Sequence, residues 1–392
     1  MKHLLLLFTA ILVLSSNLFA QNTIENIVTE IAKNNTTLSA LRKKADAEKI
    51  GNKTGIYLQN PEAEFSYLWG NPSVIGNRTD ISIRQTFDFP TAYGYKNQIS
   101  DLKNEQAELE YLKQLKAIRL ETKLICSDLI YINALKLESS KRLAHAQNIA
   151  ESYKAIFDIG ETSIIEFNKA KLNLLNTQKE LESIKIERNS LWSELARLNG
   201  GQFIDFTDTV SDISVIPENF EQWYALAENN NPMLNWLKKE IEISEKQVGL
   251  NRAMSLPKLQ AGYMSESVVG EQFQGITAGI SISLWENKNQ TKFARAMALA
   301  SESMVSDYKI QFYNHLKALH EKAIGLQKNV LDYRSGLFSL DNSDLLKKAL
   351  DKGEISLINY LSELSFYYES VNKLLELERD LNKSVAELNQ YM

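Results

Sequence analysis

Few residues of this sequence stand at spacings that support catalysis or metal binding. His315 and His320 are five residues apart, so they do not share one face of a helix, and His145 has no histidine near it. The chain contains no Gly-rich phosphate loop and no His-Glu-x-x-His pattern. Its single cysteine, Cys126, has no disulfide partner and lies in the apolar run LICSDLIYI, which favours a small core residue. We therefore expect no enzyme activity, no cofactor and no resident metal.

One pattern of polar residues does recur, and it combines a glutamate with helix-breaking residues. Two decapeptides share the motif Gly-Glu-x-Ser: DIGETSIIEF at 158–167 and DKGEISLINY at 351–360. Gly160 and Gly353 can take a positive φ and end a helix. Ser163 and Ser356 can then accept hydrogen bonds from the first N–H groups of the helix that follows. Each decapeptide therefore predicts a helix–turn–helix.

The two motifs differ at the third residue after the serine. Glu166 holds this place in the first motif, and Asn359 holds it in the second. A glutamate three residues after a Ser N-cap is typical of a capping box, in which its carboxylate bonds back to the N-cap backbone. The sequence therefore predicts a capping role for Glu166 that Asn359 does not share.

Long helices must position these motifs. The segment from Thr91 to Phe157 contains no proline and one glycine, Gly94. A helix of about 67 residues reaches roughly 100 Å, which is too long for the interior of a domain of this size. We therefore expect a helix that projects from the rest of the molecule.

The helices that return from the motifs carry apolar residues at alternating steps of three and four, which predicts coiled-coil seams. The seam positions are Leu174, Thr177, Leu181, Ile184, Arg188, Leu191, Leu195 and Leu198, and Leu364, Tyr367, Val371, Leu374, Glu378, Leu381, Val385 and Leu388. Each seam contains one charged residue, Arg188 or Glu378, which we interpret as setting the register. An ion pair between these two residues is the alternative.

The chain consists of two copies of one unit. NNTTLSALRKK begins at Asn34 and NNPMLNWLKKE begins at Asn230, an offset of 196 residues that also relates Pro61 to Pro257. We assign a first repeat at 21–200, a turn-rich linker at 201–218 and a second repeat at 219–392. Each repeat begins with a helix, expected at 23–50 and 219–256, and continues with two strands and a long helical hairpin.

The strands are predicted from apolar residues that alternate with polar ones. The expected pairs are 62–69 with 79–89 and 258–265 with 275–285. The apolar residues of 275–285 fall on even numbers, where the offset predicts odd ones, so we infer one insertion or deletion in the preceding turn. Strands of this length cross a bilayer when tilted, and a trimer would supply twelve of them. Six aromatic residues near the strand ends suit membrane interfaces: Tyr67, Trp69, Phe87, Phe89, Tyr263 and Trp285.

The N-terminal segment and the net charge indicate where the protein is found and which partners it lacks. Residues 1–20 combine a basic start, an apolar core and a small residue at Ala20, which predicts a secretory signal peptide. No later segment has some 18 consecutive apolar residues, so we expect no transmembrane helix. The net charge of −5 comes without a basic stripe, which argues against nucleic-acid binding.

Taken together, these features resemble the TolC-like outer membrane efflux proteins, the outer membrane factors of tripartite efflux systems. The resemblance rests on the two tandem units, the motifs GETSIIEF and GEISLINY, and the strand segments QNPEAEFSYLWG, GNRTDISIRQTFDFP, SLPKLQAGYMSE and QGITAGISISLW. It implies a mainly α fold with a small β part. Long antiparallel helical hairpins would form a periplasmic α-barrel, and four strands per chain would contribute to a trimeric, 12-stranded transmembrane β-barrel.

The resemblance also implies a location, partners and a role. The protein would be a homotrimer in the outer membrane with a periplasmic helical extension, in contact with outer membrane lipid. It would be a passive exit duct for drugs or metal cations, linked through a periplasmic adaptor to an inner-membrane pump of the resistance-nodulation-division type. The alternative is a periplasmic coiled-coil scaffold or adaptor without a pore.

The resemblance assigns roles to the two motifs. It implies that the adaptor docks at the helical tips, which here are Gly160, Glu161, Ser163, Gly353, Glu354 and Ser356. An acidic residue six positions after the tip glycine contributes to a periplasmic constriction in the family. Glu166 holds that position in one tip, whereas Asn359 departs from the pattern in the other. A gating role and a capping role for Glu166 therefore both stay open.

Overall fold

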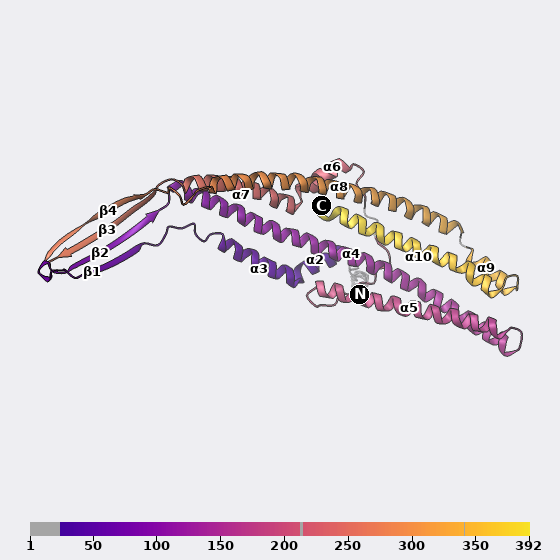
Figure 1. Cartoon of the computed structure of the whole chain (residues 1–392). Helices are drawn as coiled ribbons and strands as arrows, with labels where there is room; N and C mark the ends of the chain where they lie inside the picture. Colours follow the sequence, from indigo (N-terminus) through magenta and orange to yellow (C-terminus); the bar gives the residue numbers. More distant parts are fainter. Residues whose placement is uncertain (1–23, 212–214, 341) are drawn as a thin grey trace, which may run out of the picture.

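The chain folds into an elongated body with a four-stranded sheet at one end and two helical hairpins at the other (Figure 1). The computed structural model describes residues 24–211, 215–340 and 342–392. The expected signal peptide at 1–20 lies outside the described residues. The mainly α fold with a small β part is as the sequence predicts.

Each repeat opens with two short helices, where the sequence predicts one. Helix α2 spans Ile24–Asn34 and α3 spans Thr36–Gly51. Asn35 between them has extended backbone angles, and its side chain accepts a hydrogen bond from the N–H of Leu38. The expected helix 23–50 is therefore wrong in detail, because an asparagine side chain competes with the helical hydrogen bonds and caps a new helix instead.

The second repeat breaks at the equivalent place. Helix α6 spans Phe220–Asn229 and α7 spans Pro232–Ala253, so the expected helix 219–256 is also two helices. Asn231 accepts hydrogen bonds from the N–H groups of Met233 and Leu234. The proline at the first helical position needs no N–H partner there, which makes the new start favourable.

The long hairpins follow. Helix α4 spans Pro90–Asp158 with 69 residues and returns as α5, Ile164–Leu198. In the second repeat, α8 spans Gln290–Leu340, α9 spans Ser343–Asp351 and α10 spans Leu357–Leu388, followed by the short helix η2, Asn389–Tyr391. The outgoing helix of the second repeat is thus interrupted, whereas the sequence predicts one continuous helix. The carbonyl of Asn342 accepts the N–H of Leu346 at 3.0 Å, so a new helix starts at this polar stretch.

The strands form one antiparallel sheet in the order β1-β2-β3-β4. Strand β1 spans Glu62–Leu68 and β2 spans Arg78–Phe87, joined by a loop that contains the short helix η1, Ser73–Ile75. Strand β3 spans Lys258–Val268 and β4 spans Glu271–Ser281. Strands β2 and β3, from different repeats, are neighbours in the middle of the sheet, so β1 and β4 form its two edges.

Strand β4 begins and ends earlier than the predicted 275–285. A two-residue turn joins it to β3, and both turn residues have positive φ, 49° at Val269 and 87° at Gly270, as hairpin turns of this length require. The ladder ends where Lys258 pairs with Ser281. The next residue of β3 would be Pro257, which has no N–H to donate, so pairing stops there.

The register explains the reversed parity of the last strand. Glu62 pairs with Arg84 in the first repeat, and Lys258 pairs with Ser281 in the second. The offset is therefore 196 on the first strands and 197 on the second strands. The inferred insertion of one residue between the strands is confirmed.

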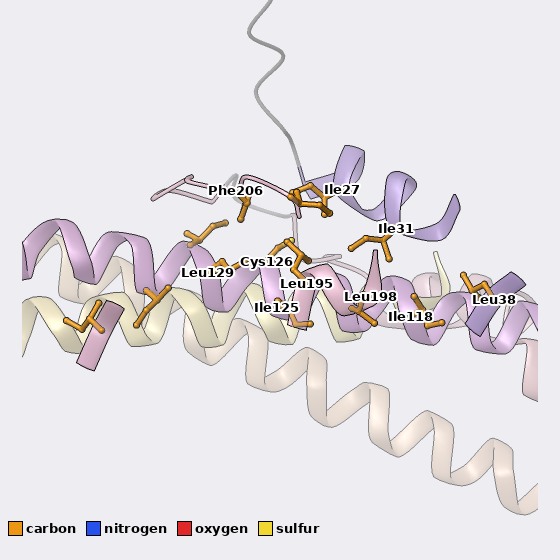
Figure 2. Packing of buried hydrophobic residues seen from close by; sticks show 14 residues of the cluster. Ile27, Ile31, Leu38, Ile118, Ile125, Cys126, Leu129, Leu195, Leu198 and Phe206 are labelled. Carbon is orange, nitrogen blue, oxygen red and sulfur yellow. The ribbon is translucent and has the colours of Figure 1, made fainter. Parts of the chain in front are cut away.

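The main apolar core lies where the N-terminal helices meet the hairpin α4–α5 (Figure 2). Ile27 and Ile31 of α2 and Leu195 of α5 belong to it, and Phe206 brings the linker into the same cluster. Cys126 is fully buried there, and burial raises the pKa of its thiol to about 12, so its predicted role as a core residue is confirmed.

A second cluster stands at the matching place of the second repeat. It contains Trp223 and Ala227 of α6 and Leu388 of α10. At the offsets of 196 and 193 residues, these positions correspond to Ile27, Ile31 and Leu195 of the main core. In both repeats, the first short helix therefore packs against the end of the returning helix.

Candidate functional site

The first Gly-Glu-x-Ser motif forms a tight turn between α4 and α5 at the far end of the hairpin (Figure 1). Gly160 has φ 82°. The N–H of Glu161 donates to the carbonyl of Ile156 at 3.0 Å, and the N–H of Gly160 donates to that of Phe157 at 3.0 Å. This pair of bonds is the Schellman closure of a helix. The Ser163 hydroxyl then accepts the N–H of Glu166 at 3.2 Å and starts α5.

The second motif repeats this geometry between α9 and α10. Gly353 has φ 72°, the N–H of Glu354 donates to Ala349 at 2.9 Å, and the N–H of Gly353 donates to Leu350 at 2.9 Å. The Ser356 hydroxyl accepts the N–H of Asn359 at 3.3 Å. The helix–turn–helix prediction is therefore confirmed at both motifs, which lie at the ends of two neighbouring hairpins.

The side chains of Glu166 and Asn359 do not have equivalent surroundings. The Glu166 carboxylate accepts a hydrogen bond from Lys169 at 2.8 Å, and its second oxygen is buried without a hydrogen-bond partner. The return bond of a capping box would go to the N–H of Ser163, and Glu166 does not make it. Only half of the predicted box forms, because Lys169 lies one helical turn away and takes the carboxylate. Asn359 is exposed.

The tip glycines yield a stability prediction. A Cβ at Gly160 or Gly353 would meet nothing within 4 Å, so the left-handed backbone is the only obstacle to substitution. We expect Gly160→Ala or Gly353→Ala to destabilise the hairpin by about 1–2 kcal/mol. The control is Gly325→Ala in the interior of α8, where there is also open space and where alanine should stabilise by about 0.5–1 kcal/mol. Thermal unfolding followed by circular dichroism measures both, and equal effects at the three positions would contradict the turn geometry.

A polar network joins the two hairpins of the chain near their tips, and we call it the inter-hairpin seam. It consists of Arg142 and His145 on α4 and of Tyr360, Tyr368 and Asn372 on α10. The Tyr360 hydroxyl lies 2.9 Å from Nε2 of His145, and the Tyr368 hydroxyl lies 3.4 Å from Nδ1 of the same ring. Arg142 donates to the carbonyl of Tyr368 at 3.3 Å and to the Asn372 side-chain oxygen at 2.8 Å.

Burial sets the protonation of this seam. Burial lowers the pKa of His145, and the nearby Lys347 ammonium lowers it further, so the imidazole is neutral at pH 7. Burial likewise raises the pKa of Tyr360 to about 12, which keeps its hydroxyl protonated. Burial also lowers the pKa of Arg142, whose guanidinium lies 4.4 Å from the centre of the Tyr368 ring. Neutral His145 can therefore donate a hydrogen bond to one tyrosine hydroxyl and accept one from the other.

We expect Tyr360→Phe to weaken the inter-hairpin seam. The change removes the hydroxyl and leaves a half-buried imidazole nitrogen without its partner, at a cost of about 1 kcal/mol. Phe167 occupies the equivalent position in the first repeat, so the ring itself fits this fold. Hydrogen exchange at the ends of α4 and α10 measures the effect, and unchanged protection in the variant would contradict the role of the hydroxyl.

The same seam should depend on pH. The folded-state pKa of His145 lies below its unfolded value, so the unfolded chain binds the proton first as the pH falls. Stability is therefore complete above the unfolded value of about 6.5 and is lost as the pH falls from there through the lower folded pKa. His145→Gln should flatten this dependence, and a variant with the wild-type slope of melting temperature against pH would rule His145 out.

The two charged residues of the helical seams do not pair with each other. Arg188 donates to the side-chain oxygen of Asn133, and its guanidinium stacks 3.7 Å from the centre of the Trp192 ring. Glu378 pairs with Arg334 of α8 at 2.7 Å. The alternative of an Arg188–Glu378 ion pair is therefore wrong, because each residue finds a partner on the adjacent helix of its own hairpin.

All charged side chains of the sheet lie on one face, which also holds Leu68, Val268 and Phe273, whereas the opposite face carries none. By the register, one face carries every charged residue of the four strands: Glu62, Glu64, Arg78, Asp80, Arg84, Lys258, Glu266 and Glu271. Arg78 contacts Asp80 at 2.8 Å and Glu266 at 3.1 Å. The other face carries apolar side chains that stay exposed: Phe65, Tyr67, Ile81, Ile83, Leu259, Tyr263, Ile276 and Ile280. An exposed apolar surface of this extent indicates a contact with lipid or with protein.

The six predicted interfacial aromatics divide into three groups. Tyr67 and Trp69 make an edge-to-face contact at 5.7 Å beside the loop end of the sheet. Phe87 ends β2, and Phe89 directly precedes α4, both at the opposite end of the sheet. A fifth, Tyr263, lies in the middle of β3, and Trp285 lies beyond the end of β4, so these two do not stand at strand ends as the sequence predicts. The two-residue turn explains both positions, because β3 ends later and β4 begins earlier in the sequence than predicted.

None of the helices described here is both long and apolar enough to cross a membrane. Among the described residues, no group of three or more His, Cys, Asp or Glu side chains could hold a metal ion.

Comparison with known proteins identifies the fold. No family model matches the chain, and no curated protein sequence matches it. The CmeC outer membrane channel of Campylobacter jejuni superposes with a TM-score of 0.76 at 14% identity, over 94% of this chain and 85% of that chain. This chain has the TolC-like fold. The outer membrane protein VceC of Vibrio cholerae gives 0.71 at 12% identity over 94% of both chains, and CusC gives 0.74 at 14% over 94% and 92%.

Within the TolC-like fold, the inter-hairpin seam is what sequence reasoning missed. His145 and Tyr360 are 215 residues apart, and no local spacing links them. One difference between the otherwise similar motifs indicates the seam: Tyr360 stands where the first motif has Phe167. A tyrosine hydroxyl at a buried position needs a hydrogen-bond partner.

Proposed function

We propose that this chain is the outer membrane channel of a tripartite efflux system, a passive trimeric exit duct for drugs or metal cations. The sheet with one apolar and one charged face carries this proposal. Such a sheet suits a transmembrane barrel, whose strands place apolar residues towards lipid and polar residues towards a hydrated lumen. The likeness to solved outer membrane channels over 94% of the chain supports it.

The two edges of the sheet support a homotrimer. Strands β1 and β4 have no neighbour on their outer sides within the described sheet. Unpaired backbone groups are not tolerated in lipid, so a membrane sheet has to close on itself. Pairing of β4 from one copy with β1 of the next gives a closed barrel, and three copies give twelve strands. The outer membrane location and the periplasmic helical extension follow from this arrangement.

The helical tips are the proposed docking site of a periplasmic adaptor. Glu161, Ser163, Glu354 and Ser356 are exposed beside the two glycines at the far end from the sheet. They offer short, rigid turns with polar side chains to a partner. The adaptor would link the duct to an inner-membrane pump of the resistance-nodulation-division type, which supplies the work.

The alternative is a periplasmic scaffold or adaptor without a pore. The helical hairpins would serve such a role as well, because coiled coils present long surfaces to partners. A scaffold has no need of a sheet that exposes a continuous apolar face. We therefore favour the channel, and the two functions differ in where the protein is found.

A pair of lysine substitutions at neighbouring positions of β2 tests the channel. Ile83 lies on the apolar face, half exposed, and Ser82 lies on the charged face. We expect Ile83→Lys to cost about 2–4 kcal/mol of membrane stability and to abolish the trimer, because it places a charge in lipid. The control Ser82→Lys should insert normally. Outer membrane yield and conductance in planar bilayers measure both, and a wild-type protein found only in the soluble periplasmic pool would favour the scaffold.

A second pair tests Glu166 as a gate residue. In a trimer, Glu166 would add three carboxylates to the constriction, whereas Asn359 adds none. We expect Glu166→Gln to lower the preference of the channel for cations and Asn359→Asp to raise it, because a ring of carboxylates attracts cations. The reversal potential across a bilayer with unequal salt measures this preference. If neither change shifts it, the partly buried Glu166 carboxylate serves only to hold Lys169.

A further inference from the structure

The apolar face of the sheet continues past the end of β4, towards the helices. Ile276 and Ile280 lie on that face, and Ile282 and Leu284 keep the same alternation beyond the last paired residue. All four side chains are exposed, over 61% to 90% of their surface. The chain that leaves the sheet is therefore still apolar when it reaches the junction with α8.

The residues that follow are aromatic and basic. Trp285 is 79% exposed, and Phe293 in the first turn of α8 is 63% exposed. Lys288, Lys292 and Arg295 are exposed as well. Lys292 and Arg295 are three residues apart, so they share one face of α8. We call these five residues the junction patch, because α8 begins where the sheet meets the helices (Figure 1).

The first repeat has the same junction with its charge neutralised. Lys96 is the counterpart of Lys292 at the offset of 196 residues. Its ammonium lies 2.9 Å from the carboxylate of Asp88, which is buried. Leu284 and Trp285 stand where the offsets of 196 and 197 place the counterpart of Asp88. The second junction therefore has the lysine without its carboxylate.

The cations of the junction patch have no acidic partner in the part of the chain that the structure describes. None of the three has a described carboxylate oxygen within 4.0 Å. Glu286 is taken by Lys258 at 3.1 Å, and Glu245 lines a hollow between α7 and α8 together with Arg295. The dipole of α8 disfavours a cation in its first turn, so Lys292 does not stabilise the helix that it begins. An anion from outside the chain would compensate these charges.

We propose that the junction patch binds the phosphate of an anionic phospholipid, in the bilayer leaflet nearer to the helices. Its three basic side chains contact the headgroup, and Trp285 and Phe293 lie at the depth of the headgroups. The inference rests on the proposed function in so far as that function places the sheet in a bilayer. It goes further by naming a lipid class and the residues that select it.

The order of residues along 276–295 supports a lipid as the occupant. Aliphatic side chains come first, Trp285 follows, and Lys288 and Lys292 come next. This order matches the profile of a bilayer, in which aliphatic residues meet the hydrocarbon, aromatic rings lie at the interface and basic residues attract anionic headgroups. The long apolar stem of a lysine also lets its ammonium reach the headgroups from within the interface.

The opposite end of the sheet lacks this charge. Arg78 is the cation there among the described residues, and it contacts Asp80 at 2.8 Å and Glu266 at 3.1 Å. Its charge is therefore compensated within the chain. Charge complementarity favours anionic headgroups at the helical end of the sheet and not at the loop end.

Native mass spectrometry of the full chain in detergent measures this binding, with phosphatidylglycerol and phosphatidylcholine of the same acyl chains as probes. We expect the wild-type protein to prefer phosphatidylglycerol and to lose the preference as the salt concentration rises, because salt screens exposed charges. Lys288→Gln with Lys292→Gln should lower the affinity for phosphatidylglycerol by roughly fivefold for each lysine removed. The affinity for phosphatidylcholine should stay unchanged.

A matched control removes the same charge from another part of α8. Lys322 and Lys328 are exposed on this helix and far along it from the sheet. Lys322→Gln with Lys328→Gln should keep the wild-type preference for phosphatidylglycerol. Equal affinity of the junction variant and the control variant for this lipid would overturn the proposal.

The junction variant also separates a lipid contact from a position in the lumen. Lysines in the lumen would repel cations, so their removal would raise the preference of the channel for cations. We expect an unchanged reversal potential for Lys288→Gln with Lys292→Gln. A shifted potential together with wild-type lipid binding would place the lysines in the lumen and overturn the lipid site.

The lipid site and the channel can fail independently. A wild-type protein that conducts and binds both lipids equally well would overturn the lipid site and leave the channel standing. A protein that prefers phosphatidylglycerol through the two lysines and does not conduct would support the lipid site and overturn the channel.

Discussion

A helix of 69 residues has to bury a stripe along its whole length, and this constraint governs the rest of the molecule. Helix α4 extends over roughly 100 Å, so no single core can cover it. It is stabilised in sections instead. The main core around Cys126 holds its middle, and the cluster around Tyr360 holds its far end. Neighbouring helices along the flank, rather than a central core, are what keep such a helix folded.

The repeat turns this constraint into an assembly. Each repeat consists of a strand pair and a helical hairpin, and within one chain each repeat has the other as its neighbour. The two edge strands of the sheet, β1 and β4, have no outer neighbour within the described sheet. In the proposed trimer, another copy on each side supplies the missing neighbours of these edge strands.

The differences between the repeats are as informative as the likeness. The seam within the chain has acquired partly buried hydrogen bonds, among them those of His145 and Arg142. Buried polar networks of this kind fix one arrangement, because any shift leaves groups without partners. Helix α5 carries exposed charges instead, such as Lys171.

The sequence by itself determined the elements that depend on local chemistry. The helix–turn–helix tips follow from Gly160 and Ser163 and their repeats, since a positive φ and an N-cap are properties of single residues. The strands follow from the alternation of apolar and polar residues. The shifted parity of the last strand indicated an insertion or deletion in the turn before it. The length of α4 follows from the absence of proline. The TolC-like fold was therefore predictable almost in full.

Only the tertiary structure decided which side chains meet. The break at Asn35 depends on a cap that also donates to the carbonyl of Leu198, far away in the sequence. The end of β4 depends on Pro257, which precedes the neighbouring strand β3 and stops the pairing, rather than on its own residues. Glu166 was free to bond back to the helix start, yet it pairs with Lys169. His145 found its two tyrosines across 215 and 223 residues. Such contacts are set by how elements pack, and periodicity within one element carries no information about a partner on another.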